Sequence, residues 1–175
     1  NVIREHAKFT ARNEVCSNSV KVNFKYAVIA TGTEPIIPEI KGLKDLPYFT
    51  NETIFSLAEL PSHLIIIGGG SIGMELAQAF NRLGAQVSVI ESKSLLWNQD
   101  TEFTKAIRKM LASEGIIFYE RTSIDNIMSK NKEILIKTKK KLITGSHILV
   151  SAGRLINTKA IGLEKAGVIE KNGLI

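Results

Sequence analysis

Residues 64–91 read LIIIGGGSIGMELAQAFNRLGAQVSVIE, and the fold class of the chain is predicted mainly from them. Four apolar residues, 64–67, predict a short buried strand. After a glycine-rich turn, residues 71–83 place apolar side chains at helical spacing until Gly84 ends the pattern. Residues 86–90 predict a second strand, which ends at an acid. This order is that of a parallel βαβ unit, so we expect an α/β fold with a doubly wound, Rossmann-like sheet.

The turn contains glycines at G-x-G-x-x-G spacing, which in this setting is the fingerprint of dinucleotide binding. Gly68 permits a sharp turn out of the strand, Gly70 lets a pyrophosphate approach the backbone, and Gly73 lets the helix pack on the sheet. The free amides and the positive dipole end of the helix favour a phosphate there. The alternative is a glycine-rich turn without a ligand, but strand, helix and second strand together favour a dinucleotide site.

The acid that ends the second strand predicts the kind of dinucleotide. Glu91 lies 23 residues after Gly68, close to the spacing of about 20 at which a carboxylate accepts hydrogen bonds from the adenosine ribose. The same carboxylate repels a 2′-phosphate, so NAD(H) is favoured over NADP(H). Lys93 would offset part of that repulsion.

Composition excludes several other classes of protein. The formal net charge is +6, with lysines concentrated in a predicted hairpin, at Lys130, Lys132, Lys137, Lys139, Lys140 and Lys141. That patch lacks aromatic residues for base stacking, so we expect a solvated face and no nucleic-acid partner. No apolar run approaches 18 residues, so we expect no membrane span. The single cysteine, Cys16, fits a reducing compartment, and we expect a cytoplasmic protein.

Three parts are expected along the chain. Residues 1–58 begin with short alternating runs that predict an antiparallel meander, and they continue with a buried strand at 26–30, a proline-spaced connector and a short helix within 51–60. Residues 59–152 predict the doubly wound domain: besides the fingerprint, a helix capped by Asp100 or Thr101 that buries Phe103, Ile107, Met110 and Leu111, a strand at 116–119, a β-meander at 122–143 and a closing strand at 148–152. Residues 153–175 predict a connector with a small helix at 158–166.

Three segments resemble motifs of one family, the flavin-dependent pyridine nucleotide-disulfide oxidoreductases. Residues 26–35, YAVIATGTEP, resemble its ATG motif, and residues 68–75, GGGSIGME, resemble its NAD-binding turn. Residues 148–157, ILVSAGRLIN, resemble its G-R-x-P-N motif, with Ile156 where the family has proline. The helix that starts the fingerprint domain is most similar to those of mercuric reductases and dihydrolipoamide dehydrogenases. Members of this family are more than twice as long, so the chain resembles an internal fragment.

The resemblance implies two cofactors. It makes 1–58 a partial FAD-binding domain, 59–152 the NAD(H)-binding domain and 153–175 a truncated return to the FAD-binding domain. FAD would contact Ala7, Thr31, Gly32 and Thr33. NAD(H) would contact Gly68, Gly69, Gly70, Ser71, Ile72, Gly73, Met74, Glu75, Glu91, Ile124 and Gly153. In this assignment Ile124 touches the adenine, Gly153 lies beside the nicotinamide nucleotide, and Glu75 reaches toward the nicotinamide–flavin contact; the alternative for Glu75 is a solvent-facing helix acid.

The implied activity is that of a longer flavoprotein. In it, hydride would pass between NADH and flavin, and electrons would then reach a disulfide, a metal ion or another acceptor. Family members are usually homodimers, so we expect one here. We assign no catalytic residue and no metal ligand within the chain, and we expect the fragment alone to be inactive. The alternative is a non-catalytic NAD(H)-sensing module, against which the Thr31–Gly32 turn argues because a sensor needs no flavin.

Overall fold

A computed structural model describes residues 1–131, 133–171 and 173–175, so Lys132 of the basic hairpin lies outside the described residues. The chain forms two compact units, one of residues 1–34 with 154–175 and one of residues 35–153. Residues 35–58, which the sequence pattern places with the N-terminal part, lie in the second compact unit, where the strand Phe49–Thr50 pairs with the main sheet. Among the described residues, no helix is long and apolar enough to span a membrane.

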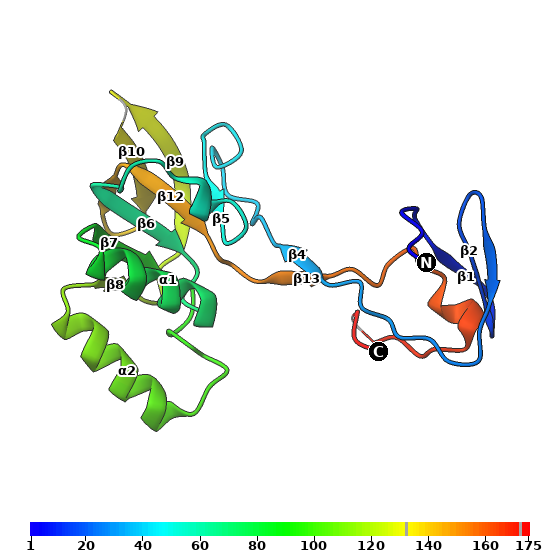
Figure 1. Cartoon of the computed structure of the whole chain (residues 1–175). Coiled ribbons are helices and arrows are strands. Elements are labelled where there is room, and N and C mark those ends of the chain that lie inside the picture. The colour runs from blue at the N-terminus through cyan, green and yellow to red at the C-terminus, as the bar shows by residue number, and fades with distance from the viewer. Residues whose placement is uncertain (132, 172) are drawn as a thin grey trace. The chain divides into compact units, whose positions relative to one another are not determined.

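The second unit is built on a five-stranded parallel sheet (Figure 1). Its strands, in spatial order, are β5 (Phe49–Thr50), β12 (His147–Val150), β6 (His63–Ile67), β7 (Gln86–Ile90) and β8 (Ile117–Tyr119). The register sets Ile65 of β6 between Ser88 of β7 and Ile148 of β12. The predicted α/β class and its parallel sheet are therefore confirmed.

Both faces of the sheet are covered, which explains why β6 is apolar without interruption. Leu64 and Ile66 point into a core shared with α1 (Ser71–Arg82) and α2 (Thr101–Ser113). Ile65 and Ile67 point into a second core. That core is closed by the antiparallel strands β9 (Ile124–Lys130), β10 (Glu133–Thr138) and β11 (Leu142–Gly145), which are the predicted meander.

The helix boundaries follow the predicted signals. Gly84 ends α1 with a φ of +107°, a conformation that glycine adopts without strain. Asp100 caps α2, because its Oδ1 accepts a hydrogen bond from the amide of Glu102 at 2.8 Å. Both features confirm the sequence-based assignment and fix where the loops around the sheet begin.

The predicted burial of α2 is wrong for three of its four apolar residues. Phe103, Ile107 and Met110 are exposed, and Leu111 is the residue that enters the core. The helix therefore contacts the core near its C-terminal end, and its apolar spacing predicts a larger interface than the one that forms. Leu83, at the end of α1, is likewise exposed.

The first unit contains the predicted antiparallel meander. Its strands are β1 (Lys8–Ala11), β2 (Glu14–Cys16) and β3 (Lys21–Asn23). A small core around Phe9 joins them to the 3₁₀ turn η2 (Leu163–Ala166). The short strands β4 (Thr33–Pro35) and β13 (Arg154–Ile156) pair with each other.

Three local predictions fail. Residues 26–30 form no strand, because they have no ladder partner among the described residues. The helices expected within 51–60 and at 158–166 shrink to single 3₁₀ turns, η1 (Ile54–Ser56) and η2. Helices this short lack the length over which helical hydrogen bonding becomes cooperative, so packing of one or two side chains decides them.

Candidate functional site

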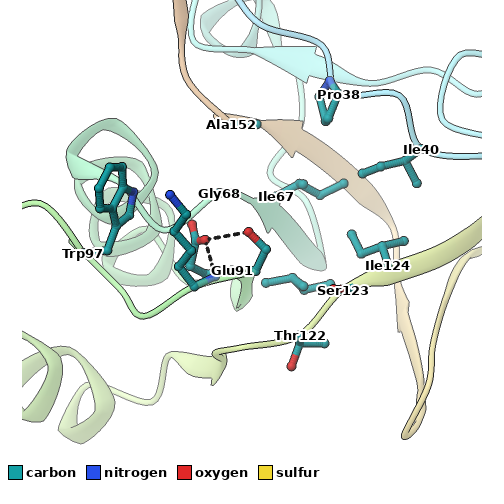
Figure 2. A pocket seen from close by; sticks show the side chains of 13 residues that line it. Pro38, Ile40, Ile67, Gly68, Glu91, Trp97, Thr122, Ser123, Ile124 and Ala152 are labelled. Carbon is teal, nitrogen blue, oxygen red and sulfur yellow. Dashed lines mark hydrogen bonds between the residues drawn. The ribbon is translucent and has the colours of Figure 1, made fainter.

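A cavity of about 400 Å³ lies at the carboxyl end of the parallel sheet. Its floor is formed by the ends of β6, β7 and β12, and its walls come from the connector before β5, the loop after β7 and the start of β9. The lining residues are Pro38, Ile40, Ile67, Gly68, Ile90, Glu91, Ser92, Lys93, Trp97, Thr122, Ser123, Ile124 and Ala152 (Figure 2).

The strand order explains why the cavity forms here. From β6 the chain adds β7 and then β8 on one side, and it returns through the meander to place β12 on the other side of β6. The loops after β6 and β12 therefore leave the sheet in different directions. Ligands of open α/β sheets bind in the crevice that such a switch in strand order opens at the carboxyl ends.

The glycines of the fingerprint meet different surroundings. A Cβ on Gly68 would lie 2.4 Å from the carbonyl oxygen of Ser151, and the φ of Gly68 is +112°. A Cβ on Gly73 would lie 2.2 Å from the carbonyl oxygen of Gly68, so α1 packs directly on the strand end. These contacts confirm the steric roles predicted for Gly68 and Gly73. Around Gly70 no atom lies within 4 Å of a Cβ position, so the backbone there is open to a ligand.

The start of α1 is free of side-chain caps. Its N-cap is Gly70, no side chain accepts from the first amides, and no acidic residue stands in the first turn. The first amides of an α-helix have no acceptor within the helix, so here they are available to an anion. Ser71 and Glu75 are exposed and Ile72 is half-buried. Met74 differs: its side chain is buried and its amide donates to the Gly70 carbonyl oxygen, which leaves it no free polar group for a cofactor.

Glu91 is directed toward the glycine corner. One carboxylate oxygen accepts a hydrogen bond from the Gly69 amide at 2.8 Å, and the other accepts from the Lys93 amide at 2.7 Å and the Ser92 hydroxyl at 3.1 Å. These three bonds hold the carboxylate at the cavity wall, beside the turn that follows β6. Figure 2 shows Glu91 at this wall. A carboxylate can accept about four hydrogen bonds, so one position stays available to a hydroxyl.

Sequence reasoning assigned no site role to Trp97, which forms one wall of the cavity. The Lys93 ammonium lies 3.7 Å from the centre of the Trp97 ring, a cation–π contact. Figure 2 shows Trp97 on one side of Glu91, with Ile40 and Ile124 on the other. The only available signal was that the single tryptophan of the chain follows the acid of the fingerprint by six residues. Gly153 lies one residue beyond the lining residue Ala152.

The first unit has its own cavity, of about 340 Å³, beside the predicted flavin residues. Ala7 and Thr31 line it, together with the apolar residues of segment 26–30 and of β1. Two side chains hold the Thr31–Thr33 turn. The Arg154 guanidinium donates to the hydroxyl and the carbonyl oxygen of Thr33. The Asn157 side-chain amide donates to the Thr31 carbonyl oxygen, and its backbone amide donates to the Gly32 carbonyl oxygen. These contacts join the two family motifs that the sequence places more than a hundred residues apart.

The two histidines of the sheet, His63 and His147, form hydrogen bonds with serine hydroxyls. His63 Nε2 shares a hydrogen bond of 2.9 Å with the hydroxyl of Ser88, which is fully buried. Burial lowers the pKa of His63 below its ordinary value. His147 pairs with the hydroxyl of Ser146. Within the described part of the chain, no three His, Cys, Asp or Glu residues come together as metal ligands would.

Comparison with known proteins identifies relatives across the whole chain. A family model described as pyridine nucleotide-disulphide oxidoreductase matches residues 1–175. Mercuric reductase of Lysinibacillus sphaericus is 33% identical over 95% of the chain, and that of Bacillus cereus is 35% identical over 95%. The chain spans only 32% and 27% of the lengths of these two relatives.

Solved structures have the same fold. The flavoprotein disulfide reductase RclA of Escherichia coli superposes with a TM-score of 0.85 at 25% identity, over 99% of this chain and 41% of that one. LpdA of Mycobacterium tuberculosis superposes with a TM-score of 0.78 at 21% identity, over 97% of this chain and 40% of that one, which shows the fold alone.

Proposed function

The chain belongs to the pyridine nucleotide-disulphide oxidoreductase family, and on that premise we propose that it forms the NAD(H)-binding part of an FAD-dependent oxidoreductase. When bound, the two cofactors supply the redox chemistry, in which hydride passes between nicotinamide and flavin. The protein residues supply binding, orientation and exclusion of water. The residues that accept the final electrons would lie in the rest of such a protein, since the chain spans about a third of its relatives.

One observation supports the proposal most directly: the glycine corner, the uncapped start of α1 and the Glu91 carboxylate surround one end of the same cavity. The open backbone at Gly70 leaves room for a diphosphate, and the first amides of α1 would donate to it. The apolar wall at Ile40 and Ile124 suits an adenine ring. The residues therefore fit a dinucleotide at this edge of the sheet.

Glu91 supports NAD(H) over NADP(H). Its carboxylate is held by three hydrogen bonds, so it cannot turn away from the cavity without losing them. A 2′-phosphate beside it would meet a fixed negative charge, whereas a ribose hydroxyl would donate to it. Lys93 keeps its ammonium over the Trp97 ring and thus offers that charge only partial compensation.

The flavin assignment rests on the first unit by itself. Ala7 and Thr31 line a largely apolar cavity, and Gly32 has a φ of +70° with no atom within 4 Å of a Cβ position. A cofactor can approach the backbone closely at such a turn. We propose that the Thr31–Thr33 turn and Ala7 contact FAD, and that Gly153 and Glu75 belong to the nicotinamide side.

The names of the relatives suggest the class of acceptor. Mercuric reductase acts on a metal ion and RclA is a disulfide reductase, and we propose an acceptor of one of these two kinds. We further propose that the complete protein is a cytoplasmic homodimer.

Replacing Glu91 tests the nucleotide assignment. We expect Glu91→Ala to weaken NADH binding by about 1–3 kcal/mol, because a charged hydrogen-bond acceptor is removed. Trp97, the only tryptophan, lines the cavity, and its fluorescence provides the titration signal alongside calorimetry. Glu91→Gln serves as a second variant, since its amide oxygen can still accept from Gly69; it should retain the fold while narrowing the preference for NADH over NADPH.

The matched control is Glu59→Ala, which removes an exposed acid outside the cavity lining and should leave NADH affinity unchanged. Equal NADH affinity in wild type and Glu91→Ala would show that Glu91 does not contact the nucleotide.

The colour of the complete protein distinguishes an oxidoreductase from a sensor. We expect a yellow protein whose colour is bleached by NADH. A colourless protein that still binds NADH would instead be a sensing module.

A further inference from the structure

A second hollow, of about 220 Å³, adjoins the dinucleotide cavity and carries a different set of side chains. It is lined by Arg121, Thr122, Ser123, Thr138, Lys139 and Lys140, which are three cations and three hydroxyl residues without a carboxylate. Thr122 and Ser123 line both cavities, so the hollow lies directly beside the nucleotide site within the same unit.

The positive charge in the hollow is only partly compensated by the protein, because Glu120 lies close enough to Arg121 for an electrostatic attraction. Within the described residues, Arg121, Lys139 and Lys140 form no ion pair. Glu120 makes its hydrogen bonds to other groups: one oxygen accepts from the Leu95 amide at 3.1 Å and the other from Arg108 at 2.6 Å. Three like charges around one hollow repel one another, and a bound anion would remove that repulsion.

Both loops that carry these cations are fixed by hydrogen bonds. The Thr138 hydroxyl donates to the Lys141 carbonyl oxygen and accepts from the amides of Lys140 and Lys141, which closes the turn between β10 and β11. On the opposite side, the Arg121 amide donates to the Lys93 carbonyl oxygen at 2.8 Å. A loop whose backbone is already held loses less conformational entropy on binding than a mobile loop would.

The backbone of Arg121 is itself unusual. Its φ is +49°, in the left-handed region that residues other than glycine seldom adopt. Such conformations persist where the surrounding contacts enforce them, and they concentrate at ligand-binding positions. Lys141 is not part of the hollow, because its ammonium lies 4.8 Å from the Tyr119 ring centre. The charge is therefore confined to three residues.

From the hollow, the excess of positive charge in its lining and its hydrogen-bonded loops, we infer that the site formed by Arg121, Lys139 and Lys140 binds a multivalent phosphate-type anion, separate from the diphosphate of the dinucleotide. Hydroxyls of Thr122 and Ser123 would donate to the anion beside the cations. The inference concerns the meander side of the cavity and does not depend on the proposed redox function.

Titration of the ¹⁵N-labelled full chain with inorganic pyrophosphate, at constant ionic strength, tests the inference. We expect saturable shifts of the amides of residues 121–123 and 138–140. The variant Arg121→Gln/Lys139→Gln/Lys140→Gln should bind at least tenfold more weakly. The control variant Lys105→Gln/Lys109→Gln/Lys130→Gln removes the same charge from exposed positions outside the hollow and should bind as wild type does. Lys139→Gln/Lys140→Gln leaves the Arg121 loop intact and should show an intermediate loss.

Two outcomes would overturn the inference. Shifts confined to residues 68–73 would place the anion at the glycine corner, and equal losses in the two triple variants would reduce the effect to net charge. Titration with NADPH is a further test. If the triple variant of the hollow binds NADPH more weakly than wild type does, and wild type shows no saturable binding of pyrophosphate, the hollow is a subsite for the 2′-phosphate and the inference of a separate anion is wrong. If NADH failed to bind, the proposed function would be wrong, but binding of pyrophosphate in the hollow would still stand.

Discussion

Two segments of this chain have the same local pattern and different structures. Residues 64–67 and residues 26–30 are both short apolar runs that lead into a glycine-containing turn. The first becomes β6, the centre of a parallel sheet, with Leu64, Ile65 and Ile66 fully buried. The second forms no strand, and Tyr26 and Val28 are 83% and 92% exposed.

The difference lies in hydrogen-bonding partners. β6 is paired along both edges, by β7 and β12, and both of its faces are covered. Residues 26–30 have no paired strand among the described residues, so their backbone groups gain nothing from extended geometry. Apolarity makes a strand possible, and pairing decides whether it forms. The turns that follow the two segments differ in the same way. The position of the Gly68 turn is fixed by the paired strands of the sheet, whereas the Thr31–Thr33 turn is held by hydrogen bonds from side chains.

A charge introduced into each segment should give the largest difference in stability between the two. We expect Ile66→Asp to cost about 4 kcal/mol or more of unfolding free energy, because an unpaired carboxylate would enter a filled core. Val28→Asp, at an exposed site, should change it by no more than about 0.5 kcal/mol. Urea unfolding is followed by Trp97 fluorescence, which reports the sheet unit, and by far-ultraviolet circular dichroism, which reports both units. A comparable loss in the two variants would mean that residues 26–30 are packed in solution.

The two glycine turns should differ by a smaller amount. In Gly68→Ala, backbone strain of about 1–2 kcal/mol adds to a clash with Ser151 that costs about 1–3 kcal/mol. Gly32→Ala carries only the strain, since space around it is open. Denaturation and NADH titration of both variants check this, and we expect NADH binding to fall only in Gly68→Ala. If Gly32→Ala also lost NADH binding, the cavity of the sheet unit would not be the whole site.

Removing a side-chain brace should loosen the second turn alone. Arg154→Ala loses two charge-assisted hydrogen bonds to Thr33. A hydrogen bond of this kind contributes about 1.5–3 kcal/mol when it is buried, and these two contribute less because they are partly exposed. We expect amide exchange at residues 31–33 to speed up by about tenfold, which corresponds to about 1.4 kcal/mol. Exchange in β6 should not change. Arg154→Lys, which keeps the charge without the fork of donors, should rescue only part of the protection.

The smallest expected effect concerns the polar start of β6. Because burial lowers the pKa of His63, the unfolded chain takes up a proton at a higher pH than the folded chain does. Stability contributed by neutral His63 is thus present above its ordinary pKa of about 6.5 and declines as the pH falls below it. The urea concentration at the midpoint of unfolding should fall between pH 7.5 and pH 5.5. The fall should be larger in wild type than in His63→Gln, whose side-chain amide can still form a hydrogen bond with Ser88. Equal drops would assign the pH dependence to other groups.

Much of the sheet unit could be predicted because its signals are local. The βαβ unit, the cap at Asp100, the meander and the place of Glu91 beside the glycines all follow from periodicity, turn residues and spacing. The exposed face of α2 could not be predicted, since its apolar spacing is the same whether or not another element covers it. The contact between Lys93 and Trp97 could not be predicted either, because the irregular loop that carries both residues has no repeating pattern of apolar residues.

Local sequence accounts for the fingerprint: a buried strand, glycines where a Cβ would clash with the backbone, and an acid at the end of the next strand. Each depends on the steric and hydrogen-bonding limits of residues near one another in the chain. Long-range packing determines which segments pair, which side of α2 is covered, and that the ends of β6, β7 and β12 line one cavity beside a basic hollow. The reason is that these contacts join residues far apart in the chain, and their free energy depends on the partners that the fold supplies.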